Sequence, residues 1–177
     1  LGLIGFGAIA RETCRIAKAL GMNVAAYDPF VSSEDPAWEM ARPLSLEELL
    51  SSADVISLHA PSKPETYQIL SREVLRKMKD DALIVNTARG QLIDEAALIE
   101  ELEKGRFYAY LDVCDPEPPA ADSPLRRLEN VTLVPHIAGC IQDCSQLSEL
   151  AVENLRRFFA GETLQNEITR DMLKRIS

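Results

Sequence analysis

Basic residues, cysteines and long apolar runs are all scarce in this sequence, and each shortage argues against a class of protein. The 177 residues include 19 Lys and Arg against 28 Asp and Glu, which gives a formal net charge of −9. Nucleic acids and anionic membranes attract basic surfaces, so we expect neither as a partner. Four cysteines are too few for a disulfide scaffold. No apolar run approaches the roughly 18–20 residues that cross a bilayer, and no basic, then apolar, leader opens the chain, so a cytoplasmic protein is predicted.

Short apolar runs alternate with helix-like stretches along the chain. Apolar residues make up 46% of it, enough for a domain with a substantial core. The alternation is typical of βαβ units and predicts an α/β fold of Rossmann type, a doubly wound, mostly parallel sheet with helices on both faces. Strands are expected at residues 1–5, 23–27, 54–58, 82–86, 107–111 and 131–134, and helices at 8–20, 46–50, 71–78, 94–104 and 142–160.

The two ends of the chain set the expected domain limits. Residue 1 is Leu rather than Met and already lies in an apolar run, so we expect further residues upstream. Residues 1–160 are expected to form one nucleotide-binding domain, including the long helix 142–160 that Gly161 ends. The polar stretch 161–177 is expected to be a tail, because it is too short for a domain of its own.

Residues 5–10 (GFGAIA) match the G-x-G-x-x-G/A turn that joins a strand to a helix in dinucleotide-binding sites. Gly5 allows the tight turn, and Gly7 lets the backbone approach a pyrophosphate at the helix N-terminus. Asp28 follows the second strand, where a carboxylate accepts hydrogen bonds from ribose hydroxyls. A carboxylate repels a 2′-phosphate and no Arg or Lys follows before Arg42, so NAD is predicted rather than NADP. The alternative is a structural turn beside a surface Asp.

Further chemically suggestive residues follow later strands, where ligands bind in open α/β sheets. Arg89, in the stretch NTARG, has a planar guanidinium that suits a carboxylate, although it could instead cap the loop through carbonyls. His136 is one of two histidines, and a dehydrogenase needs such a group to exchange a proton with the substrate oxygen. Glu117, in a proline-rich loop, is a candidate to orient that imidazole and favour its charged form. A single His at a strand end is otherwise more often structural.

Together these motifs resemble those of the D-isomer-specific 2-hydroxyacid dehydrogenases, the family of D-3-phosphoglycerate dehydrogenase and glyoxylate/hydroxypyruvate reductase. The matching stretches, in the family's order, are GLIGFGAIARE, HAPSKPET, VNTARGQLIDEAAL, LDVCDPEPP and PHIAG. The resemblance implies an NAD-dependent oxidoreductase that interconverts a small 2-oxo acid and a D-2-hydroxy acid, and that works as a homodimer. It also implies that the tail 161–177 returns to a substrate domain absent from this chain.

Residue roles follow from the resemblance position by position. Arg89 would hold the substrate carboxylate and carbonyl, His136 would be the acid/base, and Glu117 would be its partner. The positions implied to contact NAD are Gly5, Gly7, Ala8, Ile9, Asp28, His59, Pro61, Thr66, Thr87, Ala88, Arg89, Asp112, His136 and Gly139.

Other interpretations compete with this one. An S-adenosylmethionine methyltransferase also has a glycine-rich turn and an acid after its second strand, but it has no need of Arg89, Glu117 and His136. A short-chain dehydrogenase is excluded because no Tyr is followed four residues later by Lys. A non-catalytic NAD sensor or corepressor of the same family stays open, and so does the identity of the 2-hydroxy acid.

The cysteines do not point to a metal centre. Cys140 and Cys144 follow His136 at intervals of four residues, a spacing that two turns of helix would place on one face. Pro135 argues against a helix there, and zinc sites usually pair their ligands more closely. No metal site is therefore predicted, and a reactive thiol at Cys114 or Cys140 is a minor alternative.

Overall fold

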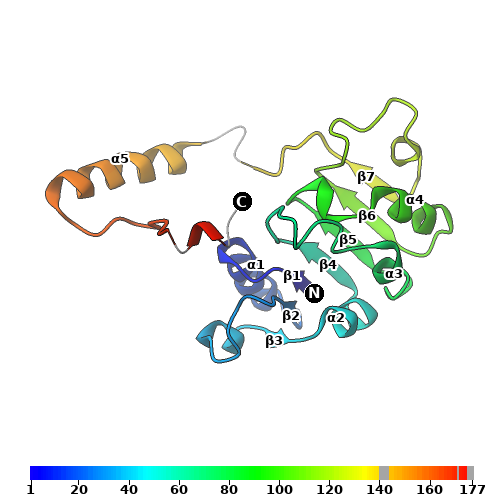
Figure 1. Cartoon of the computed structure of the whole chain (residues 1–177), viewed down its shortest axis with the longest axis horizontal. Helices are drawn as coiled ribbons and strands as arrows, with labels where there is room; N and C mark the ends of the chain where they lie inside the picture. The colour runs from blue at the N-terminus through cyan, green and yellow to red at the C-terminus, as the bar shows by residue number, and fades with distance from the viewer. Residues whose placement is uncertain (140–143, 171, 175–177) are drawn as a thin grey trace. The chain divides into compact units, whose positions relative to one another are not determined.

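A seven-stranded, all-parallel sheet organises the computed structural model, which describes residues 1–139, 144–170 and 172–174 (Figure 1). The order is β3-β2-β1-β4-β5-β6-β7, and every neighbouring pair is parallel. This is the doubly wound Rossmann order with one more parallel strand at its end, so the predicted fold class is confirmed. The strands are β1 (Gly2–Ile4), β2 (Ala25–Tyr27), β3 (Arg42–Pro43), β4 (Val55–Leu58), β5 (Leu83–Asn86), β6 (Tyr108–Leu111) and β7 (Val131–Leu133).

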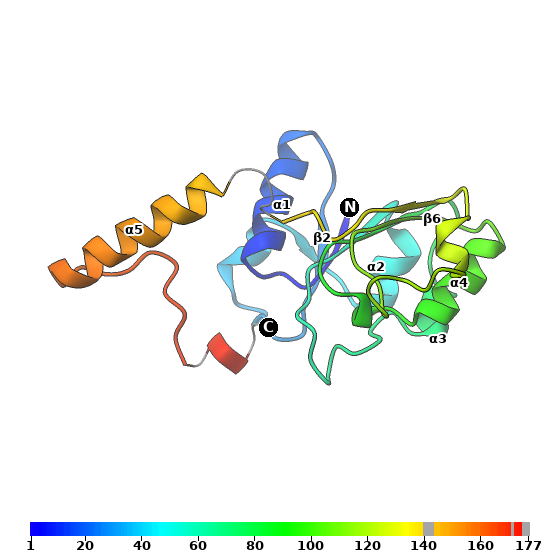
Figure 2. The ribbon, with the colours of Figure 1, turned by 90° about the horizontal axis from the view of Figure 1, so that it is seen from above.

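Helices cover both faces of the sheet. Leu3 of β1 packs in one apolar cluster with α1, whereas its neighbour Ile4 packs in a second cluster with residues of α2, α3 and α4. Figure 2 shows α2, α3 and α4 grouped together, apart from α1. The bounds are α1 (Ala8–Ala19), α2 (Leu46–Ser52), α3 (Arg72–Leu75), α4 (Glu95–Glu103) and α5 (Ser145–Ala160), with 3₁₀ turns η1 (Pro36–Glu39), η2 (Gly90–Leu92), η3 (Pro124–Arg126) and η4 (Met172–Lys174).

Local capping signals in the sequence determine where helices begin. Ser45 and Glu48 form a reciprocal capping box at the start of α2. Asp94 caps α4 by accepting a hydrogen bond from the backbone N–H of Ala97 at 3.0 Å. Gly161 ends α5 with a φ of +70°, a left-handed conformation that favours glycine.

One expected element differs from the structure, and one element was missed. The helix expected at 71–78 is only one turn long, because Met78 and its neighbours close 3₁₀-type turns instead of continuing α3. The strand β3 was not predicted, since it has two residues and one of them is Pro43. Proline lacks a backbone N–H and is tolerated at a sheet edge, where β3 lies.

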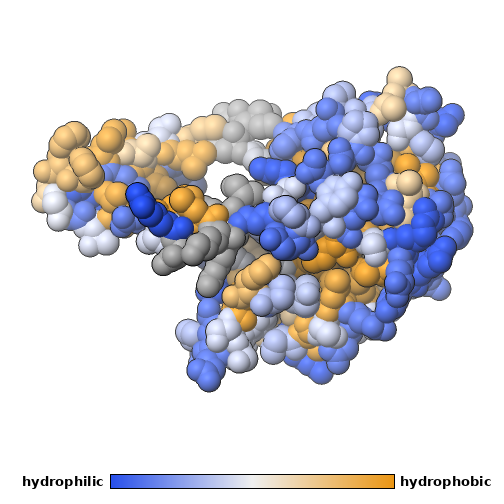
Figure 3. Space-filling view, viewed as in Figure 1, coloured by the Kyte–Doolittle hydropathy of each residue, from blue (hydrophilic) through white to orange (hydrophobic). Residues whose placement is uncertain are grey.

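The described residues divide into two compact units, Leu1–His136 and Ile137–Ser177. The expected domain limit at residue 160 stays a prediction. The second unit contains α5, whose expected first residues 142 and 143 lie outside the described part of the chain. None of the sixteen residues of α5, all described, is buried, and hydrophobic side chains gather on its surface in Figure 3. Large exposed ones are Leu147, Val152, Leu155, Phe158 and Phe159. Within the described ranges, no helix has the length and apolarity to cross a membrane.

Candidate active site

The residues singled out in the first unit follow the carboxyl ends of the strands. The glycine-rich turn comes after β1, Asp28 after β2, Arg89 after β5, and His136 three residues after the end of β7. Because all seven strands are parallel, these ends share one edge of the sheet, the edge at which open α/β folds bind ligands. Gly139 belongs to the second unit, so its contact with NAD stays a prediction.

The glycine-rich turn has the shape that a pyrophosphate needs. Gly5 has a φ of +89°, and a Cβ there would lie 2.7 Å from the backbone nitrogen of Ala60. Gly7 has an ordinary φ of −78°, and a Cβ there would meet no atom within 4 Å. Gly7 is also the N-cap of α1, with no side-chain cap and no acidic residue in the first turn. The open space and the helix N-terminus together fit an anionic phosphate group.

Asp28 anchors the same turn. Its Oδ2 accepts a hydrogen bond from the backbone N–H of Phe6 at 2.8 Å, and its Oδ1 accepts one from Phe30 at 2.8 Å. A carboxylate has about four acceptor positions, so each oxygen can still accept a ribose hydroxyl. The sequence predicted the ribose role but not the bond to Phe6, which joins residues 22 apart.

The Arg89 loop is organised by Asn86, the last residue of β5. Asn86 is fully buried, and its Oδ1 accepts from the N–H of Ala88 at 3.1 Å while its Nδ2 donates to the carbonyl of Arg89 at 2.9 Å. The exposed Arg89 guanidinium donates to the carbonyl of Ala88 at 2.6 Å. Sequence reasoning missed the role of Asn86, although a polar residue at the end of an apolar strand was a usable signal.

Gly90 brings the Arg89 loop against the loop that follows β6. A Cβ at Gly90 would overlap the carbonyl group of Cys114 and would lie 2.7 Å from the backbone nitrogen of Asp115. Only glycine therefore fits here with the two backbones this close. Sequence reasoning missed this contact as well.

His136 and Glu117 lie together, as the resemblance implied. Nδ1 of His136 is 2.6 Å from Oε1 of Glu117, and because an ionised carboxylate only accepts, Nδ1 carries the proton. The backbone N–H of His136 donates to the carbonyls of Asp112 at 2.9 Å and Val134 at 3.1 Å. These bonds hold His136 at a φ of +52°, and such left-handed residues other than glycine gather at functional sites.

A cavity of about 350 Å³ adjoins this pair. Its lining includes Glu117, His136 and Arg126. The Arg126 guanidinium donates to the carbonyls of Pro119 at 2.7 Å and Ala120 at 3.0 Å, which ties the proline-rich loop to η3. The imidazole and the carboxylate are each about half exposed (50% and 42%), so a small substrate can reach them.

Other residues expected to contact NAD make bonds within the protein. The buried Thr66 hydroxyl donates to the carbonyl of Pro61 at 2.5 Å and accepts from the N–H of Lys63 at 3.0 Å. Nε2 of His59 is 2.9 Å from the hydroxyl of Ser57. Burial lowers the pKa of His59, which favours the neutral ring. Their expected contacts with NAD, like those of Ala8, Ile9, Thr87, Ala88 and Asp112, stay predictions.

The Cys114 thiol is buried, and the described part of the chain holds no cluster of metal-ligand side chains. Burial, followed by the negative charges of Glu95 and Glu117, raises the pKa of Cys114 to about 11. The reactive thiolate is therefore disfavoured at Cys114. Cys140 lies outside the described residues. Among those that are described, no three His, Cys, Asp or Glu side chains gather as metal ligands would.

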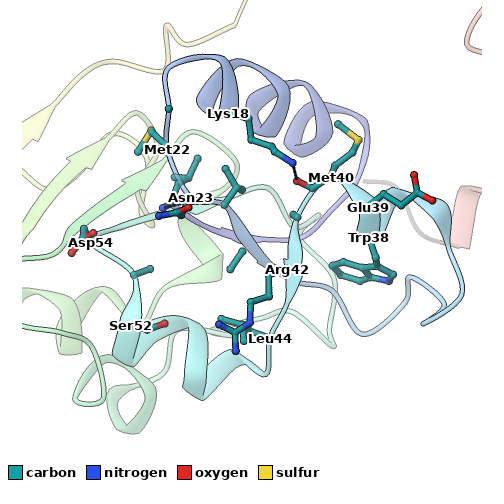
Figure 4. A pocket seen from close by; sticks show the side chains of 16 residues that line it. Lys18, Met22, Asn23, Trp38, Glu39, Met40, Arg42, Leu44, Ser52 and Asp54 are labelled. Atoms are coloured by element: carbon teal, nitrogen blue, oxygen red, sulfur yellow. Dashed lines mark hydrogen bonds between the residues drawn. The ribbon is translucent and has the colours of Figure 1, made fainter.

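A larger hollow, of about 860 Å³, lies at the amino ends of β2, β3 and β4 (Figure 4). Lys18, Trp38, Arg42 and Asp54 contribute to its lining, and the Lys18 ammonium donates to the carbonyl of Met40 at 2.9 Å. No residue predicted from the motifs lines it. The larger hollow is therefore not the candidate site. The candidate site lies at the edge of the sheet formed by the carboxyl ends of the strands.

Comparison with known proteins agrees with the geometry. The family profile "D-isomer specific 2-hydroxyacid dehydrogenase, NAD binding domain" matches residues 1–138. The chain is 44% identical over 160 residues to the (S)-sulfolactate dehydrogenase of Chromohalobacter salexigens, covering 89% of this chain and 52% of that protein. The curated relatives are longer, and the chain spans about half the length of that relative.

Two solved structures are similar to the chain along most of its length. The D-lactate dehydrogenase of Lactobacillus jensenii with NAD⁺ is 31% identical, with a TM-score of 0.79, over 96% of this chain and 55% of that one. A D-isomer specific 2-hydroxyacid dehydrogenase from Xanthobacter autotrophicus Py2, in complex with NADPH and MES, is 29% identical, with a TM-score of 0.80, over 96% and 70%. The fold thus serves both dinucleotides among these neighbours.

Proposed function

Because the chain belongs to the D-isomer specific 2-hydroxyacid dehydrogenase family, we propose that the gene product containing it interconverts a small 2-oxo acid and a D-2-hydroxy acid. The chain is an NAD-binding domain of that family. Family membership decides against the S-adenosylmethionine methyltransferase interpretation. The observation that carries the proposal is the 2.6 Å contact between Nδ1 of His136 and Oε1 of Glu117, at the same edge of the sheet as Arg89 and the glycine-rich turn.

The residues present fit NAD. The open space at Gly7 and the uncapped N-terminus of α1 would hold the pyrophosphate, and Asp28 would accept the ribose hydroxyls. When bound in its reduced form, the cofactor supplies a hydride to the carbonyl carbon of the substrate.

The chain's own residues supply binding and proton transfer. Arg89 binds the substrate carboxylate, for which its planar fork of donors is suited. Because Nδ1 of His136 is held by Glu117, Nε2 is the atom that donates the proton to the substrate oxygen. Glu117 fixes the ring's orientation and stabilises the imidazolium before the proton leaves.

The direct test is to follow NADH oxidation by the complete gene product with a panel of 2-oxo acids. The panel includes 2-oxo acids that carry a second anionic group, such as the 2-oxo acid formed when sulfolactate is oxidised. Turnover that Arg89→Ala abolishes supports the proposal. NAD binding without turnover of any 2-oxo acid favours the alternative, a non-catalytic NAD sensor of the same family.

Gly7→Ala is expected to weaken NAD binding about tenfold or more without unfolding the chain. The new methyl group meets no protein atom but takes up space at the pyrophosphate position. Isothermal titration calorimetry measures the dissociation constant, and the melting temperature serves as the control for folding. An unchanged dissociation constant would show that the pyrophosphate does not bind at this turn.

Asp28→Ala is expected to shift the preference between NAD and NADP. The variant loses the ribose acceptor and also the repulsion of a 2′-phosphate, so the ratio of the two dissociation constants moves toward NADP. The ratio is the measured quantity, because loosening of the turn at Phe6 affects both cofactors alike. Tighter binding of NADP than of NAD by the unmodified chain would contradict the assignment of Asp28.

The homodimer, which the family resemblance implies, and the cytoplasmic location, which the composition predicts, also belong to this proposal. Sedimentation velocity on the gene product measures the first, and a fluorescent fusion in its host measures the second.

A further inference from the structure

Glu95, the first residue of α4, reaches outside its own helix. Its Oε2 accepts a hydrogen bond from the backbone N–H of Asp115 at 3.1 Å, across 20 positions of sequence. The helix does not need this carboxylate as a cap, because Asp94 already accepts from the N–H of Ala97. Glu95 is thus available to hold the loop that follows β6.

That loop carries Glu117, two residues beyond Asp115. Two contacts hold this loop at adjacent residues: the Asp115 N–H donates to Glu95, and the backbone of Gly90 lies close to the Cys114 carbonyl. Both partners come from residues 90–95, which run from the Arg89 loop into the first turn of α4. Arg89 directly precedes these residues. Through Cys114 and Asp115, the loop that carries Glu117 is therefore in contact with the residues that follow Arg89.

The Glu95 carboxylate lies in a half-buried position. Burial, with the nearby charge of Asp115, raises the pKa of Glu95 despite the bond from the Asp115 N–H. An acid whose pKa is raised on folding destabilises the folded state once the pH exceeds its ordinary value, because ionisation is then harder in the folded chain. At neutral pH the raised pKa therefore means that ionised Glu95 contributes less to folding stability than the same group would in its protonated form. The negative charges of Glu95 and Glu117 both raise the pKa of Cys114, as expected for carboxylates that lie near one thiol.

We propose that Glu95 is a positioning residue: its bond to the Asp115 N–H holds the loop so that Glu117 stays against Nδ1 of His136. The consequence for catalysis rests on the proposed function, whereas the consequence for the imidazole does not. With Glu117 in place the neutral ring keeps its proton on Nδ1; with Glu117 displaced, the ring reverts to the Nε2–H tautomer that predominates in water.

The test measures the tautomer of His136 directly. Imidazole ¹⁵N shifts of the labelled 177-residue chain, at a pH where the ring is neutral, give the fraction protonated on Nδ1. The chain has only two histidines, and the signals of His136 are those lost in His136→Asn. Glu117→Ala, which removes the acceptor altogether, gives the value expected for a ring that Glu117 no longer holds.

Four variants separate positioning from a general effect of charge or folding. Glu95→Ala removes the acceptor, and Glu95→Asp keeps the charge but shortens the side chain by one methylene. Both are expected to move the Nδ1–H fraction toward the Glu117→Ala value. Glu95→Gln retains an acceptor oxygen and is expected to stay near the unmodified value. Glu103→Ala, at the exposed far end of α4, is the matched control and should leave it unchanged.

Two outcomes overturn the proposal. If the Nδ1–H fraction of His136 in both Glu95→Ala and Glu95→Asp equals that of the unmodified chain, Glu95 does not position Glu117. A Glu95→Gln variant as altered as Glu95→Ala would show that charge, not the hydrogen bond, matters. Should Glu95→Ala fail to fold, Glu95→Asp decides, because Asp is favoured in the first turn of a helix.

Activity then separates this proposal from the proposed function. In the gene product, Glu95→Ala is expected to lower kcat about tenfold with little change in KM, and Glu95→Gln to restore it, because displacement of Glu117 affects proton transfer rather than substrate binding. If the unmodified protein turns over no 2-oxo acid, the proposed function fails, but the tautomer result still decides the role of Glu95.

Discussion

His136→Ala is expected to lower kcat for 2-oxo acid reduction by about two to four orders of magnitude, the usual contribution of a positioned acid or base. The imidazole is the group at the carboxyl edge whose Nε2 can pass a proton near neutral pH while its Nδ1 is held by Glu117 at 2.6 Å. No other histidine replaces it, because His59 is held by Ser57 and its pKa is lowered by burial. Stopped-flow measurement of NADH oxidation in a single turnover isolates the chemical step.

The partner carboxylate provides the matched comparison. Glu117→Gln keeps the shape but removes the negative charge that stabilises the imidazolium, so we expect a smaller loss than for His136→Ala. Glu129→Gln makes the same chemical change at an exposed glutamate before β7 and should leave kcat as it was. A His136→Ala protein with kcat within about threefold of the unmodified protein would assign the proton transfer to another group, since general acid catalysis contributes far more.

Much of the fold was predictable because its signals are local. Apolar runs of four or five residues, separated by helix-spaced stretches, gave the strand and helix order, and caps such as Ser45 and Asp94 placed helix starts within a residue or two. The strand β3 escaped prediction because a two-residue edge strand with Pro43 has no periodicity to detect. The length of α3 was overestimated because one serine cap and a few apolar residues do not determine where a short helix stops.

The candidate site was predictable only in part. The sequence shows which residues follow strands, and the parallel sheet brings those positions to one edge. It does not show contacts made across 20 or more positions, such as that of Asp28 with Phe6 or of Glu95 with Asp115. Those contacts depend on how loops from neighbouring strands pack together, and a carboxylate in a helix's first turn looks the same in sequence whether or not it reaches another loop.

Gly90→Ala is expected to destabilise the domain strongly, because a Cβ there would lie nearer to backbone atoms than a Cβ at any other glycine of the chain. The added Cβ would overlap the carbonyl group of Cys114 and lie 2.7 Å from the nitrogen of Asp115, and these are backbone atoms that cannot rotate away. Overpacking usually destabilises by about 1–3 kcal/mol, and a clash with backbone on both sides belongs at or above the upper value. For a chain of this size, about 3 kcal/mol corresponds to a fall in melting temperature of about 6–12 °C.

The catalytic effect of the same substitution should exceed its effect on stability. To accept the methyl group, the loop carrying Arg89 and the loop carrying Glu117 must separate, and a displacement of about 1 Å between catalytic groups can reduce the rate about a hundredfold. Gly7→Ala is the matched control, because the same methyl group there meets no protein atom and should leave the melting temperature nearly unchanged. Calorimetric melting of both variants, with kcat/KM measured well below their melting temperatures, tests both effects. Equal melting temperatures for the two variants would mean that the loops are not packed against each other at Gly90. The contact at Gly90 would then not connect the loop of Arg89 to the loop of Glu117.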